Sequence, residues 1–428
     1  MHMIEANDPS LKTWLKVADD SDFPIQNIPF GVFRTELKDP VPATRIGDTV
    51  VDLSILADFG YFDKLEISDL SVFYAPVLND FIALGKNTTK AVRNRLAELF
   101  SVVCDELKSD AEARKMALVD VNDAVMMMPV EVGDYTDFYS SIEHATNVGV
   151  MFRDPDNALL PNWKHIPVGY HGRSSSIVVS GTDIRRPMGQ TMAVNSDTPA
   201  YGASKQMDFE LEMAFITNKS TQLGDQVNIE QAEDLIFGMV LFNDLSARDI
   251  QKWEYVPLGP FLGKNFGSVI SPWIVTLEAL EPFRVKGPAQ DPPVLPYLNY
   301  NGDKNIDINL EVYLKPQSGN ENLICSSNFK YMYWNMAQQL AHHTVNGCNI
   351  NPGDMYASGT ISGHTPDSYG SMLELAWKGT KPLKMDDGSE RKFIHDNDTI
   401  IMRGYAKNNE VRIGFGETAT TILPAMEK

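Results

Sequence analysis

The stretch Asp208-Phe209-Glu210-Leu211-Glu212-Met213-Ala214-Phe215 alternates acidic and large apolar side chains along most of its length. Successive side chains of a β-strand point to opposite faces, so the pattern predicts a strand with Asp208, Glu210 and Glu212 on one face. Carboxylates two residues apart on a strand lie about 6.5–7 Å from each other and repel unless water or a cation lies between them. The stretch therefore fits either a strand that holds a hard divalent cation or an edge strand whose acids face solvent.

Two other segments bring acids to the ends of predicted strands. The apolar run 239–243 ends at Asp244, and the segment 134–141 contains Asp137. Together with Glu210 and Glu212 these acids would make an all-oxygen cage suited to Ca²⁺ or Mg²⁺, with no soft ligand to favour zinc. Spacing alone does not show that the four side chains meet.

Short β-like patterns punctuated by Gly and Pro dominate the chain from residue 125 onward. The predicted strands include 176–179, 239–242, 355–358 and 373–377. Predicted helices are few: one begins with Asn228 as N-cap, and another runs from Asn328 to about Val345. This part of the chain is expected to form a β-rich barrel or roll.

The N-terminal part has a different pattern. It combines β-like runs at 30–33 and 49–53 with a helical stretch from Lys86 to Leu107. The chain has 428 residues, and domains usually contain about 100–200, so two domains are expected. We predict a small barrel-like domain over 1–124, and a catalytic β-rich domain over 125–428 that begins with a buried segment at 126–130.

The charge balance limits the partners. The chain has 57 Asp and Glu against 37 Lys and Arg, a net charge of −20 that repels nucleic acid and anionic lipid. An anionic substrate would need local basic groups, and Arg153, Arg248 and Lys264 are the candidates. Lys264 lies in an apolar, glycine-rich stretch that favours a pocket, although solvated surface charge is the common role of such residues.

Cysteine content and hydropathy indicate a cytoplasmic protein. Three widely spaced cysteines suggest neither a disulfide framework nor a thiolate zinc site. The first eight residues contain no apolar signal segment, and no run of about 18 apolar residues occurs. We expect a reducing compartment and no membrane span.

Several histidines could have either a functional or a structural role. His144 follows Asp137 closely and could be a general base or a core histidine hydrogen-bonded to a carbonyl. His342 and His343, in the middle of a predicted helix, are expected to be structural. His165 and His171 frame a glycine-containing loop that could be a turn or a pocket wall.

Most of the chain resembles one family, the fumarylacetoacetases or fumarylacetoacetate hydrolases. The resemblance rests on the segments 134–147, 159–173, 174–189, 208–214, 243–249, 253–267 and 357–363. It extends from the N-terminal domain to Leu423-Pro424, and the Asp-Phe-Tyr-Ser-Ser segment at 137–141 followed by His144 is specific to this family. The implied fold is mainly β (α+β): a small SH3-like β-barrel domain before a larger barrel or roll.

The resemblance also implies roles for single residues. It assigns Ca²⁺ to the four acids, the general base to His144, and the orientation of that base to Glu374. Arg248, Gln251 and Lys264 would stabilise an oxyanion. The resemblance assigns substrate binding to Tyr139, Arg153, Tyr170, Gln251, Tyr255 and Thr360. It also implies a second cation site, for Mg²⁺, formed by Asp244, Lys264 and Ser268. The family has threonine in place of Ser268.

The implied reaction is the hydrolysis of the carbon–carbon bond of 4-fumarylacetoacetate, a dianionic β-diketone, to fumarate and acetoacetate. This is the last step of tyrosine and phenylalanine catabolism, and members of the family are homodimers. Two alternatives stay open. One is an acylpyruvate hydrolase or oxo-acid decarboxylase of the same superfamily, which usually lacks the N-terminal domain; the other is a non-catalytic calcium-binding module.

Overall fold

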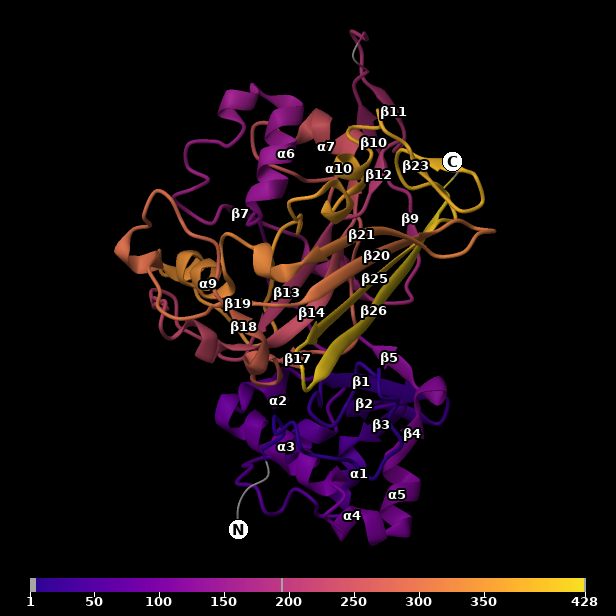
Figure 1. Cartoon of the computed structure of the whole chain (residues 1–428), viewed down its shortest axis with the longest axis vertical. Coiled ribbons are helices and arrows are strands. Elements are labelled where there is room, and N and C mark those ends of the chain that lie inside the picture. The colour runs from indigo at the N-terminus through magenta and orange to yellow at the C-terminus, as the bar shows by residue number, and fades with distance from the viewer. Residues whose placement is uncertain (1–4, 194, 427–428) are drawn as a thin grey trace.

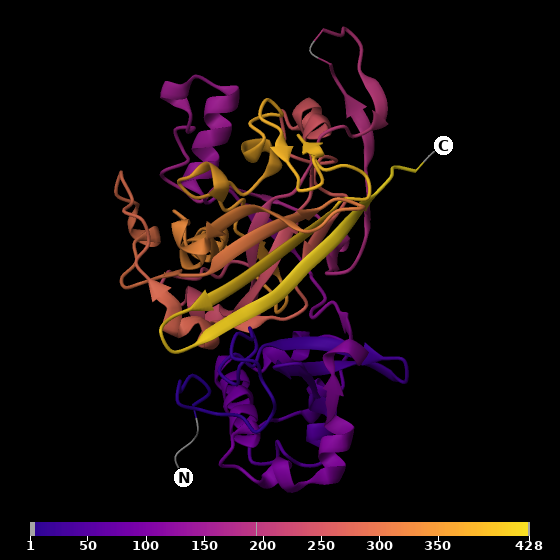
Figure 2. The same ribbon diagram turned by 45° about the vertical axis from the view of Figure 1, so that its right-hand side comes forward.

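Two units lie one above the other in the structure, which is a computed structural model (Figure 1). It describes residues 5–193 and 195–426, so the first four residues of the N-terminal segment considered above lie outside the described residues. The smaller unit contains the N-terminal part of the chain and the larger unit contains the rest, as the turned view also shows (Figure 2). None of the described helices is long and apolar enough to cross a membrane.

The smaller unit is an antiparallel sheet packed with short helices. Its strand order is β4 (Leu118–Asp120), β3 (Thr49–Asp52), β2 (Lys38–Ile46), β1 (Phe30–Thr35) and β5 (Val125–Met127). The helices are α1 (Leu53–Asp58), α2 (Asn79–Ala83), α3 (Lys86–Phe100), α4 (Glu106–Ser109) and α5 (Ala111–Ala117). Since β5 pairs with β1, this sheet includes residues beyond 124; the division at 124/125 remains a prediction.

The predicted helix from Lys86 to Leu107 is wrong at its C-terminal end. Helix α3 ends at Phe100, and Ser101 is extended because the chain there pairs with the N-terminal segment. The amide of Val102 donates to the carbonyl of Lys12 at 2.9 Å. Val103, which fits the helical period, is 78% exposed, so its position in the pattern did not reflect burial.

The larger unit is built on two sheets. The eight-stranded sheet consists of β7 (Gly169–His171), β6 (Tyr135–Phe138), β22 (Met355–Ala357), β13 (Leu211–Thr217), β14 (Ile236–Asp244), β16 (Ser268–Ile270) and β8 (Ile177–Val179), with β17 (Val275–Thr276) beside β14. The five-stranded sheet consists of β21 (Asn322–Asn328), β20 (Asn309–Lys315), β25 (Thr399–Lys407), β26 (Arg412–Leu423) and β9 (Ile184–Arg185). The architecture confirms the mainly β, α+β fold, and the larger unit is a curled half-barrel.

Four two-stranded sheets and five helices complete the larger unit as described. The strand pairs are β10 (Met188–Thr191) with β11 (Ala200–Ala203), β12 (Met207–Asp208) with β15 (Ser246–Ala247), β18 (Arg284–Val285) with β19 (Asn305–Ile306), and β23 (Leu383–Lys384) with β24 (Glu390–Arg391). The helices are α6 (Ile142–Phe152), α7 (Arg248–Glu254), α8 (Leu277–Leu280), α9 (Met336–Thr344) and α10 (Met372–Leu375). Figure 1 shows α6, α7 and α10 gathered at the end of the unit far from the N-terminal sheet.

The eight-stranded sheet is buried on both faces. One face packs on the five-stranded sheet through a core that includes Leu241, Leu310 and Phe415. The other face, which carries Ile216 and Val240, packs on the smaller unit. Strand β13 lies in the middle of this sheet and all its residues are buried. The alternative that the acidic stretch forms an edge strand with its acids facing solvent is therefore wrong.

The acidic stretch does not form one continuous strand. Asp208 ends β12, which pairs with β15, and β13 begins only at Leu211. The chain changes partner at Phe209 and Glu210, so Asp208 and Glu212 lie on different strands.

Three predicted elements differ from the structure because of local capping. Asn228 caps only a turn, accepting from the amide of Gln231 at 2.9 Å, and a single 3₁₀ turn follows at 232–235. The helix predicted from Asn328 is a 3₁₀ turn at 329–331 and then α9, which begins after a capping box at Asn335. The strand predicted at 373–377 is instead α10, whose N-cap Ser371 accepts from the amide of Glu374.

Candidate active site

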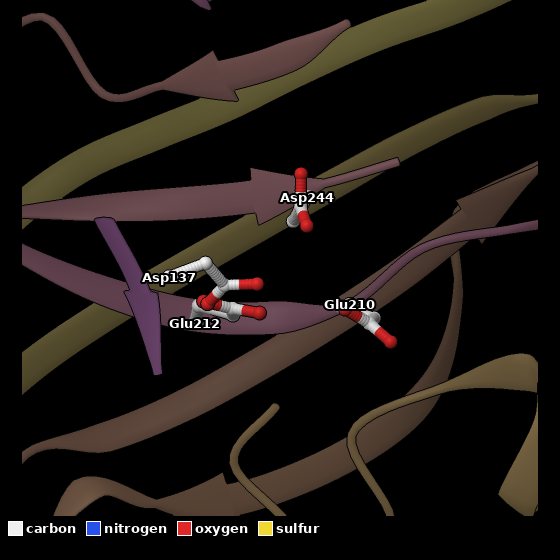
Figure 3. A group of neighbouring side chains, drawn as sticks. All are labelled: Asp137, Glu210, Glu212 and Asp244. Carbon is white, nitrogen blue, oxygen red and sulfur yellow. The ribbon is translucent and has the colours of Figure 1, made fainter. Parts of the chain in front are cut away.

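Four buried acids converge on one side of the eight-stranded sheet. Asp137 lies on β6, Glu210 just before β13, Glu212 on β13, and Asp244 at the end of β14. Each offers a carboxylate oxygen, and these oxygens all lie within 4.8 Å of one another. Figure 3 shows Asp137 and Glu212 close together, with Asp244 at the end of its strand. Strand register explains the convergence, because Ala357 of β22 pairs with both Asp137 and Ala214, two residues after Glu212.

The cluster fits a hard divalent cation. Among the described residues no donor reaches the buried oxygens Oδ1 of Asp137 and Oε1 of Glu212, and a buried carboxylate without a partner is costly. All ligand atoms are oxygens, as Ca²⁺ and Mg²⁺ prefer. The acids could hold such an ion; its identity is not fixed by these observations.

Burial and mutual repulsion act on the protonation of these acids. Burial, and then the neighbouring carboxylate of Asp244, raise the pKa of Asp137 well above its usual value. Burial and then Asp137 do the same to the pKa of Glu212. Burial also raises the pKa of Asp244, against the effect of Lys264. A cation that binds this site must therefore compete with protons.

Two basic side chains contact the cluster. The ammonium of Lys264 forms ion pairs with Glu210 and, at 2.7 Å, with Asp244. The guanidinium of Arg248 lies 2.7 Å from Glu210 through Nη2, and its Nη1 donates to the amide oxygen of Gln251 at 3.3 Å. Although burial raises the pKa of Glu210, Lys264 and Arg248 lower it below its usual value. Glu210 is thus held as a carboxylate between two cations.

A histidine–carboxylate pair lies beside the acids. His144, on α6, has its Nδ1 2.7 Å from Oε2 of Glu374, and both residues are buried. Burial raises the pKa of Glu374, but His144 and the hydrogen-bond donors Asn147 and Ser371 lower it below its usual value. The ionised carboxylate holds the proton of the imidazole on Nδ1, which leaves Nε2 as the acceptor.

The sequence alone did not reveal the residues that fix Glu374. Ser362 donates to Glu374 at 3.0 Å, Ser371 at 2.8 Å and the amide of Asn147 at 2.9 Å. The Ser371-x-x-Glu374 spacing is a capping-box pattern that could have identified the helix and one of these partners. Ser362 and Asn147 carry no comparable signal.

The residues expected to bind substrate fall into two groups. Tyr170 pairs with Asp137 in the β6–β7 ladder, the ring of Tyr139 lies 5.2 Å from that of His144, and Thr360 is buried. Arg153 and Tyr255 are instead exposed, Tyr255 by 51%. The guanidinium of Arg153 donates to the carbonyl of Ala158 at 3.1 Å through Nε. These two side chains are therefore not part of the buried cluster.

The second cation position and the other histidines show different environments. Ser268 donates to Oδ1 of Asp244 at 2.7 Å, while Lys264 binds Oδ2. His342 and His343 lie on α9, where the first contacts the hydroxyl of Tyr297 and the second packs on Tyr356. His171 lies on β7 and His165 in the loop before it.

The chain matches two family models that together cover most of its length. The model described as fumarylacetoacetate (FAA) hydrolase C-terminal matches residues 135–423, and the model described as fumarylacetoacetase N-terminal matches residues 26–129. The four acids and the His144–Glu374 pair all lie within the first of these matches.

Curated relatives match over nearly full length. A fumarylacetoacetase from Homo sapiens is 54% identical over 97% of this chain and 99% of its own length. Those from Dictyostelium discoideum and Arabidopsis thaliana are 53% and 49% identical over 97% of this chain, and over 98% and 99% of their own lengths. Among solved structures, a fumarylacetoacetate hydrolase from Exiguobacterium antarcticum aligns with a TM-score of 0.52 and 16% identity, covering 93% of this chain and 99% of that one. That likeness concerns the fold.

Proposed function

The chain belongs to the fumarylacetoacetase family, and from that premise we propose that it hydrolyses the carbon–carbon bond of 4-fumarylacetoacetate to fumarate and acetoacetate. The enzyme is a hydrolase of ketonic substrates that acts at the end of tyrosine catabolism. The observation that carries the proposal from the structure is the buried four-acid cluster beside the His144–Glu374 pair.

His144 is the proposed general base. Glu374 accepts from Nδ1, so Nε2 can take a proton from a water molecule that attacks the carbonyl on the fumaryl side. The ionised Glu374 then stabilises the imidazolium that results. His144 must later return this proton to the leaving carbon or oxygen, and its burial limits exchange with bulk solvent.

Arg248, Gln251 and Lys264 are proposed to meet the negative charge of the tetrahedral intermediate. Arg248 and Lys264 are buried, so their charges are poorly screened by solvent. Gln251 contacts the guanidinium of Arg248 and so fixes its direction. Groups of this kind stabilise the transition state because they are already oriented when charge develops.

We propose that Asp137, Glu210, Glu212 and Asp244 hold Ca²⁺. When bound, such an ion supplies Lewis acidity to the diketone oxygens. The proposed second cation, Mg²⁺ at Asp244, Lys264 and Ser268, is supported by the convergence of these three side chains, but Lys264 is itself a cation bound to Asp244. Occupation of that second position would require Lys264 to move or to share the carboxylate.

The substrate is proposed to lie between the buried acids and the exposed side chains of Arg153 and Tyr255. Tyr139, Tyr170 and Thr360 would contact its buried part, and Arg153 and Tyr255 its outer carboxylate. An exposed guanidinium suits a dianionic substrate, given the net charge of −20. The protein is also proposed to be a cytoplasmic homodimer, on the basis of its family.

The activity is tested by following the loss of ultraviolet absorbance when 4-fumarylacetoacetate is added. We expect turnover that stops with a chelator and returns with calcium. Acylpyruvate and oxaloacetate, assayed in parallel, test the sister reactions of the superfamily. Calcium binding without turnover of any of the three substrates would instead support a binding module and contradict the proposed function.

A further inference from the structure

Asp208 is a buried carboxylate that the proposed mechanism does not use. It is fully buried at the end of β12, two residues before the cluster acid Glu210. Its carboxylate accepts hydrogen bonds from two separate elements. Nε of Arg248, the first residue of α7, donates to Oδ2 at 2.7 Å. The amides of Met372 and Leu373, at the start of α10, donate at 2.6 and 3.1 Å.

These two elements carry opposite halves of the proposed machinery. Helix α7 begins with Arg248, whose Nη2 lies 2.7 Å from Glu210 and which is proposed to stabilise the oxyanion. Helix α10 carries Glu374, which holds Nδ1 of His144. Asp208 and Ser371 together satisfy the first three amides of α10, groups that a helix leaves without intrahelical partners.

The backbone around Asp208 is itself held in place. Asp208 pairs with Ser246 in the β12–β15 ladder, and the amide of Arg248 donates to the carbonyl of Gln206 at 2.9 Å. Both the acceptor and the start of α7 therefore belong to one hydrogen-bonded frame. A rigid frame of this kind fixes the direction of side chains that depend on it.

Charge also restrains the guanidinium. Arg248 lies between Asp208 on Nε and Glu210 on Nη2, at 2.7 Å from each. Without Asp208, Nε of Arg248 would lose its acceptor, and the guanidinium would no longer be held in one orientation by two carboxylates.

We propose that Asp208 is a positioning residue that fixes Arg248 and the His144–Glu374 pair relative to each other. The inference rests on the proposed function, since it concerns how that reaction is supported. Asp208 touches neither substrate nor ion in this account. It acts through Arg248 on one side and through the first turn of α10 on the other.

The variant Asp208→Asn tests the positioning role, since the side chain keeps its size and shape but one carboxylate oxygen is replaced by an NH₂ donor. In either amide orientation a donor then faces Arg248 or an α10 amide. We expect kcat to fall about 10- to 100-fold with KM little changed, the range found when supporting groups of a site are removed. Calcium affinity, measured by calorimetry, should remain within about threefold of wild type, because the four cluster acids are untouched.

Asp398→Asn is the matched control. Asp398 is buried, accepts from Arg391 at 2.7 and 2.9 Å and from the amide of His395 at 2.9 Å, and contacts none of the proposed site residues. It should lose stability comparably while kcat stays near wild type. A second test combines Asp208→Asn with Arg248→Lys, where the two losses in kcat should be less than multiplicative because both act on one contact.

The outcomes separate the two proposals. Absence of turnover in the wild type would overturn the proposed function, whereas an active wild type with an unchanged kcat in Asp208→Asn would overturn only the role of Asp208. An equal kcat loss in Asp398→Asn, or a matching loss of calcium affinity, would also overturn it. If Asp208→Asn does not fold, the smaller Asp208→Ser is assayed in its place, with the same expectations.

Discussion

Calcium binding should release protons, because the acids of the cluster repel one another when no ion is present. The perturbation is a titration of calcium into chelator-treated protein at pH 6, 7 and 8. Four carboxylates share the site, and two cations, Lys264 and Arg248, offset part of their negative charge. Arg248 also forms an ion pair with Asp208, so only part of its charge acts on the four acids. Burial and neighbouring carboxylates raise the pKa of Asp137 and Glu212 well above the usual range.

The size of the effect follows from the spacing. Two unit charges 4.8 Å apart, the largest separation within the cluster, repel by about 3.5 kcal/mol at an effective dielectric constant of about 20. A tenfold change in an equilibrium constant corresponds to about 1.4 kcal/mol, so repulsion of this size, added to burial, favours the protonated form of a carboxyl in the metal-free site. We expect up to about one proton to be released per ion, and calcium affinity to rise with pH by up to about tenfold per pH unit.

Calorimetry in buffers of different ionisation enthalpy measures this release directly. The slope of the observed heat against the ionisation enthalpy of the buffer gives the number of protons. Heats that do not depend on the buffer, together with an affinity that is flat from pH 6 to 8, would refute the reasoning about the cluster.

The free energy of unfolding of the metal-free protein should also depend on pH through these acids. The folded metal-free protein binds protons more tightly at Asp137 and Glu212 than the unfolded chain does. Their contribution to the free energy of unfolding is therefore complete below about pH 4, near the pKa of unfolded carboxyls, and is lost as the pH rises through the raised pKa values. The Tm of the metal-free protein should fall over that rise in pH, and calcium should restore it most at high pH.

Three further predictions concern single residues. His144→Ala should still fold, because Ser362, Ser371 and Asn147 keep their hydrogen bonds to Glu374, but should lose about 10²–10⁴-fold in kcat. An active variant in the absorbance assay would remove His144 from the role of base. Lys264→Met should lower kcat about 10²–10³-fold and lower the free energy of unfolding of the metal-free protein in urea by about 3–5 kcal/mol, since Glu210 and Asp244 lose their shared partner. An unchanged free energy of unfolding would contradict the contribution of these buried ion pairs. Gly359→Ala should lower the Tm and the calcium affinity, because φ of Gly359 is +78°, a new Cβ would lie 2.3 Å from the carbonyl oxygen of Phe138, and the amide of Gly359 donates to Glu212. A Tm and a calcium affinity equal to those of wild type would contradict this.

The sequence predicted the acids of the cluster better than the elements that carry them. Alternation correctly placed Glu212 on a strand, and the end of an apolar run correctly located Asp244, because both signals depend on local geometry. The same alternation wrongly placed Asp208 on one continuous strand with Glu212. The strand of Asp208 pairs with β15, nearly 40 residues further along the chain, and no local pattern reveals that change of partner.

The errors in secondary structure have physical causes of two kinds. At 373–377 the alternating apolar pattern suggested a strand, although Ser371 three residues before Glu374 was a readable helix signal. At Ser101 the helix ends because the chain pairs with Thr13, a contact between distant segments. The first error came from weighting one local signal over another; the second could not be predicted from local sequence.

The pairing of His144 with Glu374 joins residues 230 positions apart. Histidine spacing alone left a core role open for His144, and only the resemblance to a family suggested its partner. Ser362 and Asn147, which complete the environment of Glu374, became apparent only from the folded chain.

A crystal structure of the protein with calcium and a non-hydrolysable diketone analogue would show whether the four acids and His144 act on one substrate. We expect one ion bound by oxygens of Asp137, Glu210, Glu212 and Asp244 at about 2.3–2.6 Å, with the analogue between that ion and Nε2 of His144. An ion bound elsewhere, or an analogue that leaves His144 out of reach, would rule out this arrangement.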